Sequence, residues 1–298
     1  GVGALDPACI SVCHEGGAFG EDHIIGVFTA LLQNCLIAET EGSWRISQEL
    51  RDCVESLPDG GIRKTASTFV ETMLSPAGCR FVDVVPDDDP SVALGNLLCS
   101  QTENNELDVI ISTTSRSDTT VELSAITAFN ASNFARERSR RAAGLVYAPG
   151  AKSAAEVLEE AFRRVVGHCD RVEIYDRQMG KDFGANYFEA IEHWCRFFRS
   201  FDTVFELHIH TTASQASAVK AKFTEELEDS PIQLKVFGHE ESQQPHDRFL
   251  RVRGFTFDIG RGVDLFDRSG NCRDVKIGLS DHGAFTKQWR SLSSAQTV

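Results

Sequence analysis

The segment that begins at His246 carries residue types suited to holding a phosphate group. His246 and Asp247 follow a polar loop at the start of an apolar run, a position where side chains often line the rim of a pocket. Arg248 offers a planar guanidinium that can hold a phosphate or a carboxylate through two hydrogen bonds. The alternative is that His246 and Asp247 only fasten the loop by hydrogen bonds.

A second group of candidates surrounds the pair Gly260 and Gly262. Glycines this close together permit a tight turn whose amides could face an anion, with Arg261 and Asp264 beside it. An ordinary connection between two strands has the same composition. The pattern therefore supports either an anion site or a plain turn.

Two further groups lie on predicted strands. His208 and His210 are two residues apart and so point to the same face of a strand, which suits an acid–base pair or two metal ligands. No third ligand is visible nearby, and this favours a structural or cleft-lining role. Tyr175, Asp176 and Arg177 end another strand, where open parallel sheets place ligand contacts. Helix capping and a surface network are the competing explanations for Asp176 and Arg177.

From about residue 144 the sequence predicts a regular scaffold for these side chains. Strand-like runs at 145–148, 171–175, 203–210 and 232–237 alternate with helical patterns at 154–166, 187–201 and 215–227. Strands joined by single helices favour right-handed crossovers and a largely parallel sheet covered on both faces. Two later runs, 249–259 and 273–279, predict antiparallel or mixed pairing at the end of the sheet. The expected fold class is α/β, with a mixed, largely parallel sheet flanked by helices.

Three segments of this half, in this order, resemble a known family. They are Glu173–Lys181 leading into Tyr187–Trp194, then Leu207–Thr212, then His246–Arg251 with Phe257–Phe266. Together they resemble the phospholipase D-like domain at the C terminus of some MIT-domain proteins and its bacterial relatives, from about residue 144 to residue 285. The resemblance implies a phospholipase D-like fold whose eukaryotic members have lost hydrolytic activity and bind acidic membrane lipids.

The sequence departs from the motif of the parent superfamily. That motif, His-x-Lys-x4-Asp, occurs twice: one histidine attacks phosphorus, the other protonates the leaving oxygen, and the lysines hold the phosphoryl oxygens. Here Arg248 stands in the lysine position, Val252 stands in the aspartate position, and Asp258 lies further along. The counterpart in the first half of the domain, at residues 175–177, has no histidine. A second histidine would have to come from residues 208 or 210 or from a second protomer.

The sequence therefore predicts a non-catalytic binding module that recognises a phosphate-bearing ligand, such as a lipid headgroup or a nucleic acid, or a protein partner. The predicted ligand contacts are Tyr175, Asp176, Arg177, His208, His210, Arg261 and Asp264. The alternative is a phospholipase D-family phosphodiesterase or nuclease in bacterial defence or nucleic-acid processing. Its catalytic residues would be His246, Arg248 and Asp258, completed in a symmetric homodimer.

Length and composition bound these hypotheses. The 298 residues suffice for two domains, predicted as an acidic α/β domain at 1–140 of unknown family, the phospholipase D-like domain at 144–285, and a polar tail at 286–298. The net charge is −14, of which −12 falls in the first 140 residues, so non-specific binding to duplex nucleic acid is disfavoured. With no apolar run long enough for a membrane span and no signal-peptide pattern, the expected location is cytoplasmic.

The nine cysteines are an odd number in largely apolar surroundings, which favours reduced core thiols over a disulfide framework. The pattern Cys9-x3-Cys13-His14 alone has the spacing of metal ligands, and no second pair completes it. Neither a metal nor another cofactor is therefore predicted.

The first half alternates helical and strand-like patterns. Helices are expected at 21–38, 46–57, 62–74 and 90–100, strands at 79–85 and 107–112, and a polar loop or helix start at 113–120. The basic run 136–141 is expected to end a helix, where cations complement the dipole. A third functional hypothesis treats the acidic residues of this half as metal ligands. They are Asp83, Asp87, Asp88, Asp89 and Asp108.

Overall fold

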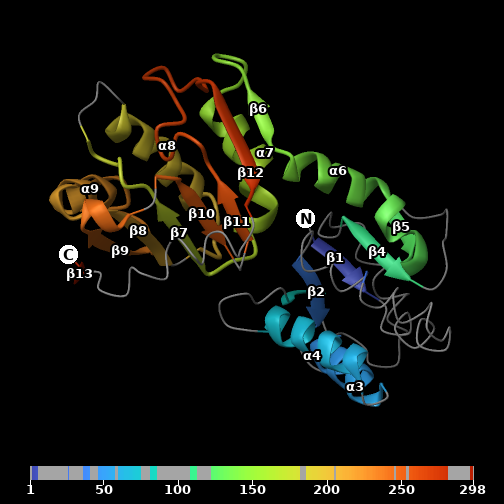
Figure 1. The fold of residues 1–298 in the computed structure, drawn as a ribbon. Helices are drawn as coiled ribbons and strands as arrows, with labels where there is room; N and C mark the ends of the chain where they lie inside the picture. Colours follow the sequence, from blue (N-terminus) through green and yellow to red (C-terminus); the bar gives the residue numbers. More distant parts are fainter. Residues whose placement is uncertain are drawn as a thin grey trace. The chain divides into compact units, whose positions relative to one another are not determined.

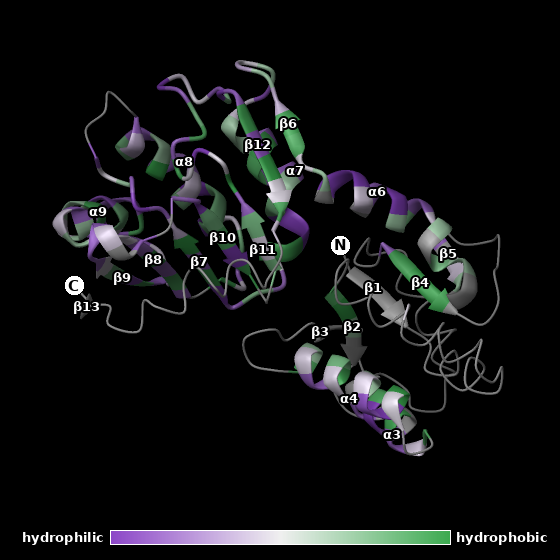
Figure 2. Cartoon of the chain, in the orientation of Figure 1, coloured by the Kyte–Doolittle hydropathy of each residue, from purple (hydrophilic) through white to green (hydrophobic). Residues whose placement is uncertain are grey.

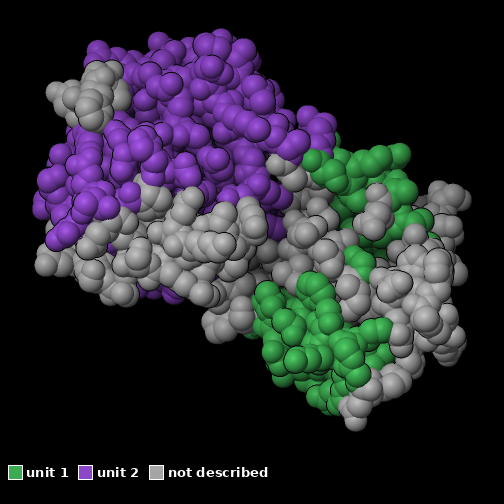
Figure 3. Space-filling view, in the orientation of Figure 1, with its two compact units in different colours: residues 1–139 green, residues 140–298 purple. Residues whose placement is uncertain are grey.

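The computed structural model describes most of the second half of the chain and separate stretches of the first. The described residues are 2–5, 26, 36–40, 46–57, 60–74, 81–85, 108–112, 122–181, 186–204, 206–244, 246–252, 255–280 and 296–297. The chain divides into two compact units, residues 1–139 and residues 140–298 (Figure 3).

Unit 1, residues 1–139, contains a five-stranded parallel sheet (Figure 1). Its strands are β1 (Val2–Leu5), β2 (Leu36–Thr40), β3 (Phe81–Val85), β4 (Val109–Ser112) and β5 (Glu122–Ala125). Their order is β3-β2-β1-β4-β5, so the chain extends the sheet on one side of β1 and then on the other. This is the doubly wound arrangement of α/β proteins.

Two of the helices described in this half follow the patterns at 46–57 and 62–74, a third carries the basic run 136–141 and ends just inside unit 2, and the 3-10 helix was not predicted. They are α3 (Ile46–Ser56), α4 (Gly61–Leu74) and α6 (Asn133–Ala142), together with the 3-10 helix η2 (Ile126–Ala131). Helix α6 is hydrophilic over most of its length (Figure 2) and carries Arg140 and Arg141 in its last turn, as predicted. The helix expected at 90–100 and the loop expected at 113–120 lie outside the described residues.

The helix predicted at 21–38 is wrong at its end. Leu36, Ile37 and Ala38 belong to β2 and are fully buried. Of the rest of that range, Gly26 is helical and the other residues lie outside the described part. The periodicity of a short apolar run does not distinguish a buried strand from a buried helix. The helical pattern of the preceding residues therefore extends the predicted helix into β2.

Unit 2, residues 140–298, contains an eight-stranded mixed sheet in the order β13-β9-β8-β7-β10-β11-β12-β6. The strands are β6 (Leu145–Tyr147), β7 (Arg171–Tyr175), β8 (Glu206–Thr212), β9 (Gln233–His239), β10 (Phe249–Val252), β11 (Phe255–Asp258), β12 (Val275–Leu279) and β13 (Gln296–Thr297). The prediction of an α/β fold with a mixed sheet is confirmed.

The prediction that the sheet is largely parallel is wrong. Among the described strands of unit 2, β7, β8 and β9 pair in parallel, whereas every other pairing is antiparallel. The run 249–259, predicted as one strand, folds back as the hairpin of β10 and β11. Gly254 within that apolar run is the sequence signal for such a turn.

The three α-helices in the described part of unit 2 form one layer. They are α7 (Ala154–Val166), α8 (Tyr187–Arg199) and α9 (Ala213–Glu226), with α7 packed on α8 and α8 packed on α9. Their apolar sides meet alternate residues of the sheet, such as Ile174 and Ile209, around a core centred on Trp194. The expectation of helices on both faces is wrong, because β7, β8 and β9 add in one direction and right-handed crossovers then stay on one side.

The start of α7 shows how local sequence sets this layer. Ser153 and Glu156 form a capping box: the Ser153 hydroxyl accepts from the Glu156 amide, and the Glu156 carboxylate accepts from the Ser153 amide at 2.8 Å. The preceding β6 and the last long strand, β12, pair at the edge of the sheet. Among the described residues, no helix is both long and apolar enough to cross a membrane.

Candidate functional site

Asp176, directly after β7, is the buried centre of the site. Its side chain is fully buried, and its carboxylate accepts hydrogen bonds from the amides of Gln178 at 2.9 Å and Val263 at 3.0 Å. Arg248 Nε donates a third bond at 3.2 Å. Burial raises the pKa of Asp176 to about 6, although Arg248 and the two amides act in the opposite direction. The residue ties the end of β7 to the turn that follows β11.

That turn is shaped around the carboxylate. Gly262 has φ +74°, and a Cβ added to it would lie 2.0 Å from Asp176 Oδ2 and 2.5 Å from Arg248 Cδ. A side chain is therefore excluded both by backbone conformation and by space. The anion that faces an amide of this turn is the protein's own Asp176, which accepts from Val263.

The guanidinium of Arg248 is fixed at two points. Besides Asp176, it binds the carbonyl oxygen of Gly260 through Nη1 at 2.7 Å. Its side chain keeps 19% of its surface exposed, so part of the donor fork faces solvent. Arg248 lies on the helix side of the sheet and Arg251 on the other, as strand alternation predicts; Arg253 lies outside the described residues.

Arg261 and Arg273 share the second buried carboxylate of this region. Arg261 Nη2 lies 3.3 Å from Asp264 Oδ2 and its Nε donates to the Asp264 carbonyl at 3.2 Å. Arg273 Nη2 lies 3.4 Å from Asp264 Oδ1, an ion pair without the geometry of a hydrogen bond. Asp264 is buried, whereas the Arg261 side chain is 44% exposed.

We call Arg248, Arg261 and Arg273, with Asp176 and Asp264, the arginine cluster. Its three guanidiniums and two carboxylates leave one positive charge. The Tyr187 ring at the start of α8 borders it: burial raises the pKa of this phenol, and the Asp176 carboxylate raises it further. The side chains of Arg248 and Arg261 each keep part of their surface exposed, whereas both acids are buried.

The proposed catalytic set does not converge in the described structure. His246 is exposed, in the loop between the 3-10 helix η3 (Glu241–Gln243) and β10. Asp258 is also exposed, and its carboxylate accepts from the Gly260 amide at 2.8 Å, which fastens the turn. It pairs with Phe249 across the hairpin, so it takes the face of the sheet opposite to Arg248.

Tyr175 and His210 lie on that opposite face, in a stack of rings. Tyr175 and Phe237 sandwich the His210 imidazole, with ring centroids 4.1 Å and 4.6 Å away. His210 Nδ1 lies 3.0 Å from His239 Nε2, and one nitrogen donates to the other. Burial, then the neighbouring His239, lowers the pKa of His210 to about 3. We call Tyr175, His210, Phe237 and His239 the ring stack.

His208 shares the face of His210, as its spacing predicts, but belongs to a charged network. Its Nε2 lies 3.1 Å from Glu206 Oε2 without the geometry of a hydrogen bond. Hydrogen bonds from Lys235 and Arg171 to Glu206 lower the pKa of that carboxyl to about 2. Burial lowers the pKa of His208. In the described part of the chain, no group of three or more His, Cys, Asp or Glu side chains is placed to hold a metal ion.

Arg177 lies at a third place, at the carboxyl ends of the parallel strands. Its Nη1 donates to the Gln244 carbonyl at 3.5 Å, and its own carbonyl accepts from the Thr212 hydroxyl at 2.6 Å. Arg177 Nε and Gln244 Oε1 are buried without a hydrogen-bond partner among the described residues. Gln244, His239 and Arg273 were missed by sequence reasoning. The sequence does contain a signal for His239, because this residue continues the strand alternation of Lys235 and Phe237 and so points to the same face.

Of the acidic residues predicted as metal ligands in unit 1, the structure describes Asp83 and Asp108, and these two lie apart. β3 and β4 are separated by β2 and β1, which places Asp83 and Asp108 about 14 Å apart at the usual strand spacing. Asp108 precedes β4, at the amino ends of the parallel strands. Residues 87–89 themselves, like Cys9, Cys13 and His14, lie outside the described residues.

Comparison of the chain with protein-family models gives no match, and comparison with curated proteins gives none either.

Proposed function

We propose that unit 2 is a non-catalytic binding module that recognises a phosphate-bearing ligand through the arginine cluster. The observation that carries this proposal is the anchoring of two partly exposed guanidiniums, Arg248 and Arg261, by two buried carboxylates at one glycine turn. Each arginine is held in place before a ligand arrives, which reduces the ordering cost of binding.

The chemistry of these groups favours phosphate. A guanidinium presents a planar fork of donors that matches phosphate oxygens, and it stays charged at any physiological pH. The surplus of one positive charge in the cluster attracts an anionic phosphate group. The phospholipase D-like resemblance of residues 144–285 points to the same ligand chemistry, since that superfamily binds phosphoryl groups.

The exposed position of His246 supports a module without catalysis. The parent mechanism needs two histidines on opposite sides of one phosphorus. Among the described residues, His246 has neither a hydrogen bond nor an ion pair, and the imidazoles of the ring stack lie within a buried set of neighbours. Arg248, which replaces the lysine, is engaged by Asp176.

The test is a calorimetric titration of the full chain with inorganic pyrophosphate. Arg261→Gln should weaken binding about tenfold or more, because a hydrogen bond to a charged group contributes about 1.5–3 kcal/mol. Arg163→Gln is the matched control: Arg163 is 51% exposed and pairs with Glu159 on α7, so its loss should change affinity little. Absence of pyrophosphate binding to the unaltered chain would contradict the proposal and leave a protein partner as the ligand to seek.

Two further arms separate the sources of the phosphate. Vesicles that contain a phosphoinositide test a lipid headgroup, and a single-stranded oligonucleotide tests a nucleic acid. If pyrophosphate displaces the vesicles or the oligonucleotide, and Arg261→Gln weakens their binding, that ligand represents the class that the arginine cluster binds.

A phosphodiesterase remains the second candidate, because an exposed His246 can meet a second copy of the chain across a symmetry axis. This version requires a dimer in solution and cleavage of a phosphodiester that His246→Ala abolishes. A monomer at assay concentration, or cleavage that survives the substitution, contradicts it.

A further inference from the structure

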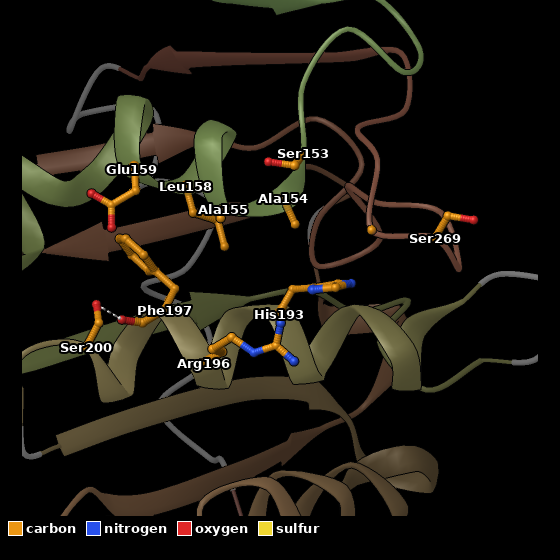
Figure 4. Close-up of a pocket in the computed structure, with 11 residues that line it drawn as sticks. Ser153, Ala154, Ala155, Leu158, Glu159, His193, Arg196, Phe197, Ser200 and Ser269 are labelled. Carbon is orange, nitrogen blue, oxygen red and sulfur yellow. Dashed lines mark hydrogen bonds between the residues drawn. The ribbon is translucent and has the colours of Figure 1, made fainter.

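A pocket of about 360 Å³ lies between α7 and α8, away from the arginine cluster (Figure 4). Its size is within the usual range of small-molecule sites. Small residues, Ala154 and Ala155, face α8 at the start of α7 and leave room for the hollow, and Gly270 is also among the residues that line it. Leu158 and Phe197 supply its apolar walls.

The pocket has a polar end and an apolar end. In Figure 4, His193 rises from α8 towards the start of α7 and the Ser269 turn, with Arg196 beside it, whereas Phe197 and Leu158 lie together further along the helices. Glu159 borders the apolar end, where Arg163 neutralises it through two hydrogen bonds of 2.8 Å and 3.1 Å. A bound anion would therefore be favoured at the His193 end.

His193 packs closely against two neighbours, Phe266 and Gly270. Its ring meets the Phe266 ring edge to face at 5.7 Å, and a Cβ on Gly270 would lie 2.9 Å from its Cε1. Gly270 has φ +76°, so the turn that seats the imidazole needs glycine on two grounds. A hydrogen-bonding group that is immobile before binding costs little ordering when a ligand arrives.

Arg196 can take a second partner. Its side chain is 70% exposed, and among the described residues it forms one exposed ion pair, with Glu192 at 2.6 Å, one helical turn away. A guanidinium carries five donors, and an exposed pair of this kind holds its partner weakly. A carboxylate in the pocket could accept from Arg196 and from His193 together.

We propose that this pocket binds a small monocarboxylate with an apolar body, its carboxylate between His193 and Arg196 and its apolar part against Leu158 and Phe197. Glu192 already pairs with Arg196, so a doubly charged phosphate would be repelled more strongly here than a monoanion. The planar carboxylate also matches the guanidinium fork. This site is separate from the arginine cluster, and neither depends on the other.

The experiment follows the amide NMR signals of the full chain during titration with benzoate. Benzamide serves as the uncharged analogue and inorganic phosphate as the anion without an apolar body. Benzoate should shift the amides of 153–159 and 193–197 saturably, and benzamide and phosphate should bind at least tenfold more weakly. Equal binding of benzamide would overturn the role of the charge, and equal binding of phosphate would overturn the role of the apolar walls.

Two substitutions locate the site. Arg196→Gln should weaken benzoate at least tenfold, while Lys222→Gln, which removes a cation from a similar ion pair on α9, should change it less than twofold. Ala155→Phe fills the pocket from an exposed helix position and should abolish the saturable shifts while the rest of the spectrum stays folded. Unchanged benzoate affinity in both pocket variants, or no saturable shift with the unaltered chain, would overturn the proposal.

Discussion

The arginine cluster and the ring stack lie on opposite faces of the same sheet and accommodate titratable groups in opposite ways. Asp176 keeps its charge for most molecules at pH 7 because Arg248 and two amides surround it. His210 is neutral at that pH, because burial between two rings lowers its pKa to about 3. Of these two buried titratable groups, one is charged and paired with fixed donors, and the other is uncharged. Their contributions to stability should therefore respond differently to mutation and to pH.

The largest effect is expected from the turn that surrounds Asp176. Gly262→Ala should destabilise the chain by about 4 kcal/mol or more, because the new Cβ displaces a buried carboxylate and its arginine. Gly150→Ala is the matched control: its φ is +73°, and a Cβ there meets nothing within 4 Å, so strain alone should cost about 1 kcal/mol. Urea unfolding of both variants measures the difference, and equal losses would show that the turn has room to adjust.

Removal of the partner charge should cost somewhat less. Arg248→Met leaves the Asp176 carboxylate buried with only backbone donors, which should destabilise the chain by about 3 kcal/mol at pH 7. Arg248 lowers the pKa of Asp176 in the parent, so its removal raises this pKa further, and protonation between pH 7 and pH 5 stabilises the folded variant more than the folded parent. The loss should therefore shrink by about 1 kcal/mol or more at pH 5. Arg268→Met, at a side chain 78% exposed, is the control; a loss independent of pH would count against a charged Asp176.

The ring stack should show the opposite dependence on pH. The folded-state pKa of His210 is lowered to about 3, so protons bind the unfolded state preferentially below about pH 6.5. Between pH 7 and pH 5 this histidine should reduce the free energy of unfolding by about 2 kcal/mol, and His210→Phe should remove that loss. Comparison of variant and parent at each pH cancels the contribution of Asp176.

The smallest effect on stability is expected at the exposed rim of the arginine cluster. Arg261→Gln should change the free energy of unfolding by less than about 1 kcal/mol, because its side chain is 44% exposed and its ion pair is partly screened. The same variant should lose pyrophosphate affinity about tenfold. Thermal unfolding with and without pyrophosphate measures both effects. A large loss of stability would indicate that Arg261 supports the buried Asp264 carboxylate and is not primarily a ligand-binding residue.

Periodicity predicted most of the elements of unit 2. Helix α7 spans Ala154–Val166 as the pattern indicates, and β7 spans Arg171–Tyr175, because capping residues and alternation mark their ends clearly. The prediction of one strand at 249–259 is wrong because the apolar composition of the run outweighs the turn signal of Gly254. The position of the helices on one face followed from strand order, which a single sequence does not contain.

The site could be predicted only where local geometry decides it. Alternation placed His208 with His210 and separated Arg248 from Arg251. The contact of Asp176 with Gly262 joins residues far apart in the sequence, and no periodicity connects them. For the same reason Arg273, which completes the ion pairs of Asp264, was not recognised.

The pairing of β6 with β12 has a consequence for the order of folding. β6, the first strand of unit 2, pairs with residues about 130 positions later in the chain. β7 likewise pairs with β10, which is also synthesised much later. At a synthesis rate of about 5–20 residues per second, β6 stays unpaired for roughly ten seconds while the rest of the unit is made. Pairings of such long range also slow refolding. Unit 2 should therefore form late and as a whole, and chains stopped before β12 should be the species most prone to aggregate.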